Sequence, residues 1–250
     1  MNPRFCLPNH FELENIEVDA KDFFHYMKNE VTPERLQRIQ EISRLKTFDV
    51  AVITENIFDR GNLNAIMRSS ENFGFSKFYS YEARKLKEAN PNSQRTTTGA
   101  EKWLEYESLS NYDLDIKRIK ELGYKVVATS LSPKALPLGK LDLCSTPVAL
   151  VFGNEKKGIS ESMQESADEL CIIENAGFTQ SLNVSVAAAI TMHHTFEKRR
   201  EAKLNTGLNE EQQSVLEGHY LFRAFQKYEY RMHELLKLYQ LRVKQGRKIT

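Results

Sequence analysis

The sequence predicts an α/β fold in which a mostly parallel sheet is flanked by helices. Short apolar runs such as "FDVAVITEN" and "PVALVFG" have the length and β-branched composition of buried strands. Between such runs lie segments with apolar residues at helical spacing, two of which end at Gly74 and Gly123. Because parallel strands must be joined by long crossover connections, this alternation favours a parallel sheet.

The expected elements follow in chain order. The first helix can begin with the cap Thr32 and with Pro33 in its first turn, and its apolar residues recur at helical spacing. Strands are expected at residues 48–56, 77–81, 125–130, 147–153 and 171–173. Helices are expected at residues 32–45, 62–75, 112–124, 161–170, 183–200 and 210–240, with a polar loop at 90–103.

The chain is predicted to have three parts. Residues 1–46 would form a helical N-terminal extension, residues 47–200 the α/β domain, and residues 201–250 a helical, basic C-terminal extension. The last boundary falls at the linker "EAKLNTGLNEE", after which the alternation of strands and helices stops. The sequence shows no internal repeat and no low-complexity tract.

Composition narrows the class of protein. With 250 residues, of which 40% are hydrophobic and 28% charged, the chain is ordinary for a globular protein. It has no apolar run of transmembrane length and no secretion signal at its start, so we expect no membrane partner. Cys6, Cys144 and Cys171 are far apart, and the acidic residues form no metal-like cluster. This pattern argues against disulfides and against a metal site, and it favours the reducing cytoplasm.

The net charge of +1 is unevenly distributed along the chain. From Glu197 to Thr250 there are twelve Lys and Arg against seven Asp and Glu, so this stretch carries +5 and the rest carries −4. A solvated helix face explains such an excess, and a polyanionic partner explains it as well.

Two segments leave a predicted strand and enter a helix with unusual polar residues. In "ENIFDRGNLNAIMR", Asn62 stands at the helix start and Arg68 follows six residues later. In "VFGNEKKGIS", Gly153 and Glu155 lie in a glycine-flanked turn that lets backbone approach a ligand closely. Such segments meet at the carboxyl edge of a parallel sheet, where ligands bind. Each one alone also fits a helix cap or a plain turn.

A third segment, "FTQSLNVSVAAAI", begins at Phe178 and has more polar residues than a helix start requires. A cap satisfies free backbone N–H groups, but Gln180, Ser181 and Asn183 exceed that need. We therefore expect this helix start to hold a polar ligand. The chain contains neither a phosphate-loop pattern nor a nucleophile elbow, which argues against the common nucleotide-binding and hydrolase motifs.

Together, these segments resemble the three signature motifs of the SPOUT superfamily, specifically those of the TrmH (SpoU) family of RNA ribose 2′-O-methyltransferases. "NLNAIMRSSENFG" resembles the first motif, "VALVFGNEKKGIS" the second and "SLNVSVAAA" the third, over roughly residues 49–194. "TTTGAEKWLEY" and residues 32–75 are similar to the tRNA guanosine 2′-O-methyltransferases of this family. The chain departs from the family at Ile173-Glu174-Asn175, where Ile-Pro-Met is common, and this change alters the wall of the cofactor site.

The resemblance implies a cofactor and an assembly that composition and periodicity do not show. The α/β domain would contain a deep trefoil knot whose loops hold S-adenosyl-L-methionine, with S-adenosyl-L-homocysteine as the product. Family contacts imply that Thr129, Gly153, Ile173 and Leu182 line the cofactor. The active site would form across a homodimer, with the first motif supplied by the partner chain.

The resemblance also assigns roles to five candidate catalytic residues. Arg68 would bind a phosphate and stabilise the developing alkoxide, because a guanidinium is a poor base. Asn62 would orient Arg68 or the ribose, and Glu155 would brace the second loop or contact Arg68 across the dimer. Ser181 and Asn183 would position the ribose or the cofactor.

The implied reaction is methylation of a ribose 2′-hydroxyl in RNA, and the expected target is a guanosine in the D-loop of tRNA. Ribosomal RNA or another tRNA position stays open as a target. A non-catalytic RNA-binding protein with this fold also stays open, although the five intact residues argue against it. Contacts with RNA phosphates are expected from basic residues of the C-terminal extension, among them Arg223, Lys227, Arg231 and Lys237.

Overall fold

Tertiary contacts divide the chain into two compact units. The computed structural model describes residues 2–82, 99–204, 207–226 and 232–246. One unit is the continuous segment Thr47–Gly207, and the other combines Met1–Lys46 with Leu208–Thr250. The segments predicted as separate extensions therefore belong to one unit, while the division into functional domains stays a prediction.

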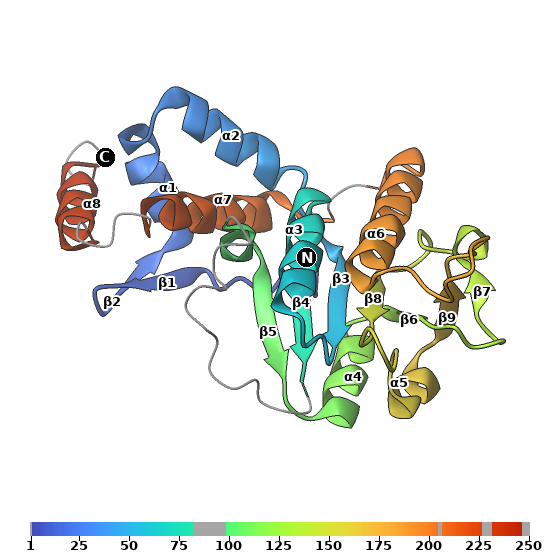
Figure 1. The fold of residues 1–250 in the computed structure, drawn as a ribbon. Helices are drawn as coiled ribbons and strands as arrows, with labels where there is room; N and C mark the ends of the chain where they lie inside the picture. The colour runs from blue at the N-terminus through green and yellow to red at the C-terminus, as the bar shows by residue number, and fades with distance from the viewer. Residues whose placement is uncertain (1, 83–98, 205–206, 227–231, 247–250) are drawn as a thin grey trace. The chain divides into compact units, whose positions relative to one another are not determined.

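The unit Thr47–Gly207 is built around a single sheet of seven parallel strands (Figure 1). The order across the sheet is β5-β4-β3-β8-β6-β9-β7, so the chain first fills one half of the sheet and then the other. The prediction of a mostly parallel α/β sheet is confirmed. The strands are β3 (Thr47–Glu55), β4 (Phe75–Tyr81), β5 (Glu105–Leu109), β6 (Lys125–Thr129), β7 (Leu136–Pro137), β8 (Val148–Phe152) and β9 (Glu169–Ile172).

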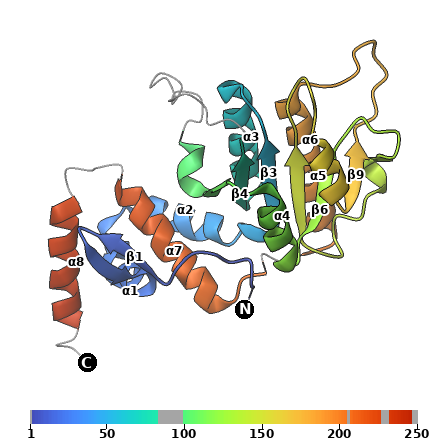
Figure 2. The same cartoon turned by 90° about the horizontal axis from the view of Figure 1, so that it is seen from below.

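Helices cover both faces of this sheet, as Figure 2 shows. Two of them, α3 and α6, pack side by side over one half of the core, and α4 and α5 cover the opposite face. The apolar residues of β3 and β8 are fully buried because both of their faces are covered. The helices of this unit are α3 (Arg60–Asn72), α4 (Tyr112–Glu121), α5 (Glu161–Ser166) and α6 (Val184–Glu201), with the short turns η3 (Ala100–Trp103) and η4 (Leu138–Lys140).

Two strands of the sheet were not expected from the sequence. Among the described strands, β5 pairs only with β4 and lies at an edge of the sheet, so its side chains alternate between more and less exposed positions. Strand β7 has two residues, which is too short for any periodicity to show. Helix α5 is shorter than predicted because the chain becomes extended at Ala167 and starts the next strand. The predicted polar loop lies outside the described residues as far as residue 98.

The second unit contains a hairpin in addition to helices. Its turn places Glu14 and Asn15 at φ values of 52° and 61°, the left-handed conformation that two-residue hairpins use. Only helices were expected in this part of the chain from its sequence. The elements are β1 (His10–Leu13), β2 (Ile16–Asp19), α1 (Ala20–Met27), η1 (Lys28–Glu30), α2 (Pro33–Ser43), α7 (Glu210–Phe225) and α8 (Met232–Gly246).

Aromatic side chains from both ends of the chain form the core of this second unit. The ring of Phe11 stacks on that of Phe222 with centroids 4.1 Å apart, and Phe23 meets Phe222 edge to face at 5.8 Å. Helices α1 and α7 approach so closely that a Cβ at Gly218 would lie 2.1 Å from the carbonyl oxygen of Ala20. Glycine at this position is therefore a requirement of helix packing.

Replacing Gly218 by alanine is expected to destabilise the second unit. The added methyl group must push apart two helix backbones, and overpacking of this kind costs about 1–3 kcal/mol. Chemical denaturation followed by circular dichroism measures the loss. Gly139→Ala serves as the control, because a Cβ there meets no described atom within 4 Å. Equal stability of Gly218→Ala and the unmodified protein would contradict the close approach.

Candidate functional site

The candidate site lies where β3, β8 and β9 end. Strands β3 and β8 pair in parallel from Val50↔Val148 to Thr54↔Phe152, so the segments that follow them leave the sheet side by side. On the other side of β8, Thr129 of β6 pairs with Cys171 of β9. The three polar segments singled out in the sequence therefore start from one edge of the sheet, as expected for a parallel α/β fold.

A chain of side-chain hydrogen bonds joins the three segments. The Nδ2 of Asn62 donates to Oε1 of Glu155 at 2.9 Å, and Nδ2 of Asn183 donates to Oδ1 of Asn62 at 3.1 Å. These residues are 93 and 121 positions apart in the sequence. The carboxylate Glu155 is exposed, so the chain of bonds faces solvent and is accessible to a ligand.

Helix caps hold two of these side chains in place. Asp59 accepts a hydrogen bond from the backbone N–H of Asn62 at 2.8 Å and so fixes the start of α3. Asn183 caps α6, because its Oδ1 accepts from the backbone N–H of Ser185 at 2.8 Å and of Val186 at 3.4 Å. Capping uses the oxygen of Asn183, which leaves the amide nitrogen to reach Asn62.

The loop after β8 is a tight turn that carries Glu155. Asn154 and Gly158 exchange two backbone hydrogen bonds of 2.9 and 2.8 Å, which close the loop on itself. Gly153 stands at its base, and a Cβ there would lie 2.3 Å from backbone atoms of Gly158 and Ile159. Only glycine fits at this position, because any side chain would collide with the backbone at the far end of the loop.

The predicted cofactor residues surround the same edge of the sheet. The hydroxyl of Thr129 donates to the carbonyl oxygen of Val151 at 3.1 Å, and Ile173 is partly buried against the core. Leu182, just before α6, is 37% exposed. Next to them, burial raises the pKa of the Cys171 thiol to about 12. This thiol is therefore neutral at physiological pH and does not act as a nucleophile.

Arg68 and Ser181 are not brought into the chain of hydrogen bonds. Both are exposed, and neither side chain forms a hydrogen bond or ion pair with any residue in the described ranges. Within this chain Asn62 bonds to Glu155 and Asn183. Arg68 lies on another face of α3, because six residues separate it from Asn62. The roles expected for both residues, and the contribution of a partner chain, stay predictions.

The candidate RNA contacts belong to the other unit. Arg223 on α7 lies over the ring of Tyr220, with its guanidinium carbon 5.8 Å from the ring centroid. Lys237 on α8 is exposed. Lys227 and Arg231 lie outside the described residues.

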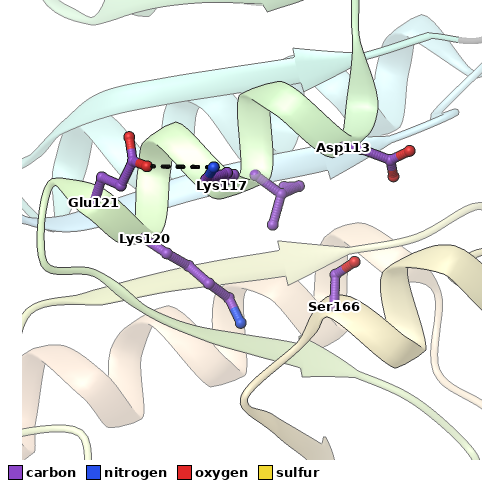
Figure 3. A pocket seen from close by; sticks show the side chains of 6 residues that line it. Asp113, Lys117, Lys120, Glu121 and Ser166 are labelled. Atoms are coloured by element: carbon purple, nitrogen blue, oxygen red, sulfur yellow. Dashed lines mark ion pairs between the residues drawn. The ribbon is translucent and has the colours of Figure 1, made fainter.

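A surface hollow of about 470 Å³ lies elsewhere, between α4 and α5 (Figure 3). Lys117 and Glu121 form an ion pair of 4.0 Å along its wall, and none of the candidate residues lines it. Among the described residues there is no group of His, Cys, Asp or Glu that could hold a metal ion. The same part of the chain contains no helix long and apolar enough to cross a membrane.

Four residues that support the site were missed by the sequence analysis. Asp59 caps α3, Asn154 turns the loop after β8, and Glu55 accepts hydrogen bonds from Ser160 across 105 residues. The spacing of Asp59 three residues before Asn62 was a readable cap signal. No local sequence pattern predicts the hydrogen bonds between Glu55 and Ser160, because they depend on the pairing of β3 with β8.

Fold and site thus define an open parallel α/β domain with a polar site at the carboxyl edge of its sheet. The sequence profile of the SpoU rRNA Methylase family matches residues 49–193. The chain belongs to this family, and the resemblance inferred from the three motifs is confirmed.

Named relatives agree with this assignment. The chain is 32% identical to the tRNA (guanosine(18)-2'-O)-methyltransferase of Borreliella burgdorferi, over 80% of this chain and 90% of that protein. It matches the structure of the A. aeolicus TrmH/SpoU tRNA modifying enzyme with a TM-score of 0.69 and 30% identity, over 76% of this chain and 96% of that one. An AdoMet-bound rRNA methyltransferase from Sinorhizobium meliloti matches with a TM-score of 0.56 and 25% identity, over 64% and 60% of the two chains.

Two substitutions at Asn183 are expected to separate its capping role from its bridging role. Asn183→Ala removes the cap and should lower the free energy of unfolding by about 0.5–2 kcal/mol. Asn183→Asp keeps a capping oxygen and should stay close to the unmodified protein, although it has no amide to donate to Asn62. Denaturant titrations measure both. Equal losses in the two variants would show that capping is not the stabilising role.

Proposed function

We propose that the protein transfers a methyl group from S-adenosyl-L-methionine to the ribose 2′-hydroxyl of a guanosine in the D-loop of tRNA. The observation that supports this most directly is the chain of hydrogen bonds from Glu155 through Asn62 to Asn183. It assembles the three motifs at the edge of the sheet where such a site is expected. The relatives named above, of which one is a tRNA (guanosine(18)-2'-O)-methyltransferase, support the choice of substrate.

The residues present fit the proposed cofactor. Gly153 lies at the base of the loop after β8, and Thr129 and Ile173 lie at the ends of the neighbouring strands. We propose that these residues and Leu182 hold the cofactor, which supplies an electrophilic methyl group when bound. The segment that follows Ile173 differs from the family pattern, and here Asn175 donates to the carbonyl oxygen of Gln180 at 3.3 Å. That hydrogen bond holds the loop at the point where the family pattern has a proline, a residue that would stiffen the backbone.

The protein's task is then to orient the ribose and to assist the loss of its proton. We propose that Asn62 and Asn183 position the ribose, and the 3.1 Å bond between their side-chain amides supports a shared role. Ser181, exposed two residues before the cap of α6, can donate to the same substrate. Arg68 carries a fixed positive charge that would bind a phosphate and stabilise the alkoxide. Glu155 braces its loop through Asn62 and Asn154.

We propose further that two copies of the chain form a homodimer through α6. Val186 and Ile190, one helical turn apart, are 46% and 40% exposed, and Leu182, just before the cap of α6, is 37% exposed. Such an apolar stripe is typical of an interface. A dimer would also employ Arg68, whose exposed side chain could serve the site of the partner. The trefoil knot belongs to this proposal, supported by the return of the chain after β9 to pack α6 against α3.

Contacts with RNA and a cytoplasmic location complete the proposal. The exposed Lys237 on α8 and the guanidinium of Arg223 are the described candidates for phosphate contacts in the second unit. Arg242 on the same helix is already engaged, because it forms an ion pair of 2.7 Å with Glu30. Residues 47–200 would then be the methyltransferase domain, and the second unit would bind RNA.

Disrupting the apolar stripe is expected to dissociate the dimer. Ile190→Glu places a charge within the proposed interface, and burying an unpaired carboxylate there is unfavourable. Analytical ultracentrifugation should show a dimer for the unmodified protein and a monomer for the variant. Leu114→Glu is the matched control, because Leu114 is 65% exposed on α4. A monomeric unmodified protein would contradict the proposal.

Methyl transfer from labelled S-adenosyl-L-methionine to an unmodified tRNA transcript tests the proposed reaction. The unmodified protein should label one guanosine ribose, located by mass spectrometry of the digested RNA. Arg68→Ala should lower the rate at saturating tRNA by about a hundredfold, as expected when one charge-stabilising donor is lost. The control is Arg38→Ala, an exposed arginine on α2.

The same assay distinguishes the alternatives. Labelling of ribosomal RNA instead of tRNA would change the substrate and keep the chemistry, and the rRNA methyltransferase among the structural matches makes this the second candidate. An absence of labelling in every RNA offered, together with retained RNA binding, would favour a non-catalytic protein.

A further inference from the structure

We propose that the loop Gly153–Ser160 is a preformed RNA-contacting loop in which Lys156 and Lys157 bind phosphates beside the target ribose. The proposal rests on RNA being the substrate and adds a binding surface within the sheet domain itself. It starts from the position of the two lysines, which directly follow Glu155, the residue bonded to Asn62. Cations at this point lie next to the candidate catalytic residues.

Lys156 and Lys157 have no charged partner among the described residues. Both side chains are exposed, and neither ammonium group forms an ion pair or hydrogen bond with any described residue. Several other lysines of the same unit are paired. The Nζ of Lys120 lies 2.7 Å from Asp168, and that of Lys125 lies 2.8 Å from Glu169. Two adjacent cations without acidic partners attract a polyanion. Their binding is favourable because it releases the counterions that are condensed on the phosphates.

The backbone of the loop is already satisfied, which determines how it can bind. The side-chain oxygen of Asn154 accepts from the backbone N–H of Lys156 at 2.9 Å and of Lys157 at 3.1 Å. These amides are therefore unavailable to a phosphate, unlike those of a nucleotide-binding loop. Only the ammonium groups remain, so the contact must be a point-charge contact that positions RNA without reading its bases.

Both ends of the loop are fixed to the end of β3. At one end, Nδ2 of Asn154 donates to the carbonyl oxygen of Asn56 at 2.8 Å. At the other, Ser160 donates to Glu55 twice, from its backbone N–H at 2.9 Å and from its hydroxyl at 2.6 Å. Glu55 is 1% exposed, so this carboxylate is held inside the protein by those bonds. A loop fixed in this way loses little conformational entropy when RNA binds.

The test measures binding of an unmodified tRNA transcript to the full-length protein at several salt concentrations. Lys156→Gln and Lys157→Gln remove the charges and leave the backbone bonds to Asn154 in place. Each should lower the slope of log affinity against log salt by about one and weaken binding, whereas cofactor affinity stays unchanged. Lys140→Gln is the matched control, an exposed lysine of η4 in the same unit. Lys237→Gln, measured in parallel, tests the proposed contact on α8.

A second pair of variants tests the attachment of the loop. Ser160→Ala removes the hydroxyl that donates to Glu55 and should weaken tRNA binding although both lysines remain. Ser160→Thr keeps the hydroxyl and should restore binding. Unchanged affinity and salt slope in the double variant Lys156→Gln/Lys157→Gln would overturn this inference alone, provided the unmodified protein methylates tRNA. An unmodified protein that neither binds nor methylates RNA would overturn the proposed function as well.

Discussion

The parallel register of β3 with β8 is the constraint on which the site depends. Pairing of Thr54 with Phe152 brings the next residues of each strand to the same level of the sheet. Asn56 and Asn154 can then bond through a short link, and Glu55 reaches Ser160 at the far end of the loop. A slip of the register would separate these atoms and would exchange the side chains that face the two helical layers. The apolar faces of the two strands thus fix the register, and the register fixes the polar loops.

Several polar residues act as parts of the fold and of the site at once. Asn183 caps a helix with its oxygen and joins the first motif with its nitrogen. Asn154 accepts two backbone bonds in its own loop and donates to the end of β3. This double use answers why the segment before α6 is richer in polar residues than a cap requires. Capping fixes the side chain in one rotamer, and a fixed side chain can bind a ligand at low entropic cost.

Much of the sheet could be predicted from the sequence because its strands are buried runs between helices of clear periodicity. The strands around Val50, Val127 and Leu150 were recognisable for that reason. The edge strand β5 and the hairpin β1–β2 were not, since exposed strands lack continuous apolar runs. The candidate residues were recognised by their motifs, but the hydrogen bonds of Asn62 to Glu155 and Asn183 could not be predicted from the sequence. They depend on contacts between residues far apart in the chain, and those contacts exist only once the sheet has formed.

The position of Arg68 gives the strongest argument for how a complete site would be assembled. Six residues separate it from Asn62, which places the two side chains about 120° apart around α3. Because Asn62 is held against Glu155 and Asn183, Arg68 has to face away from that bonded group. A single α3 can therefore supply Asn62 to its own site while presenting Arg68 to a neighbouring copy. The exposed stripe of Val186 and Ile190 lies on α6, which packs against α3, so a partner docked there would lie near the helix that carries Arg68.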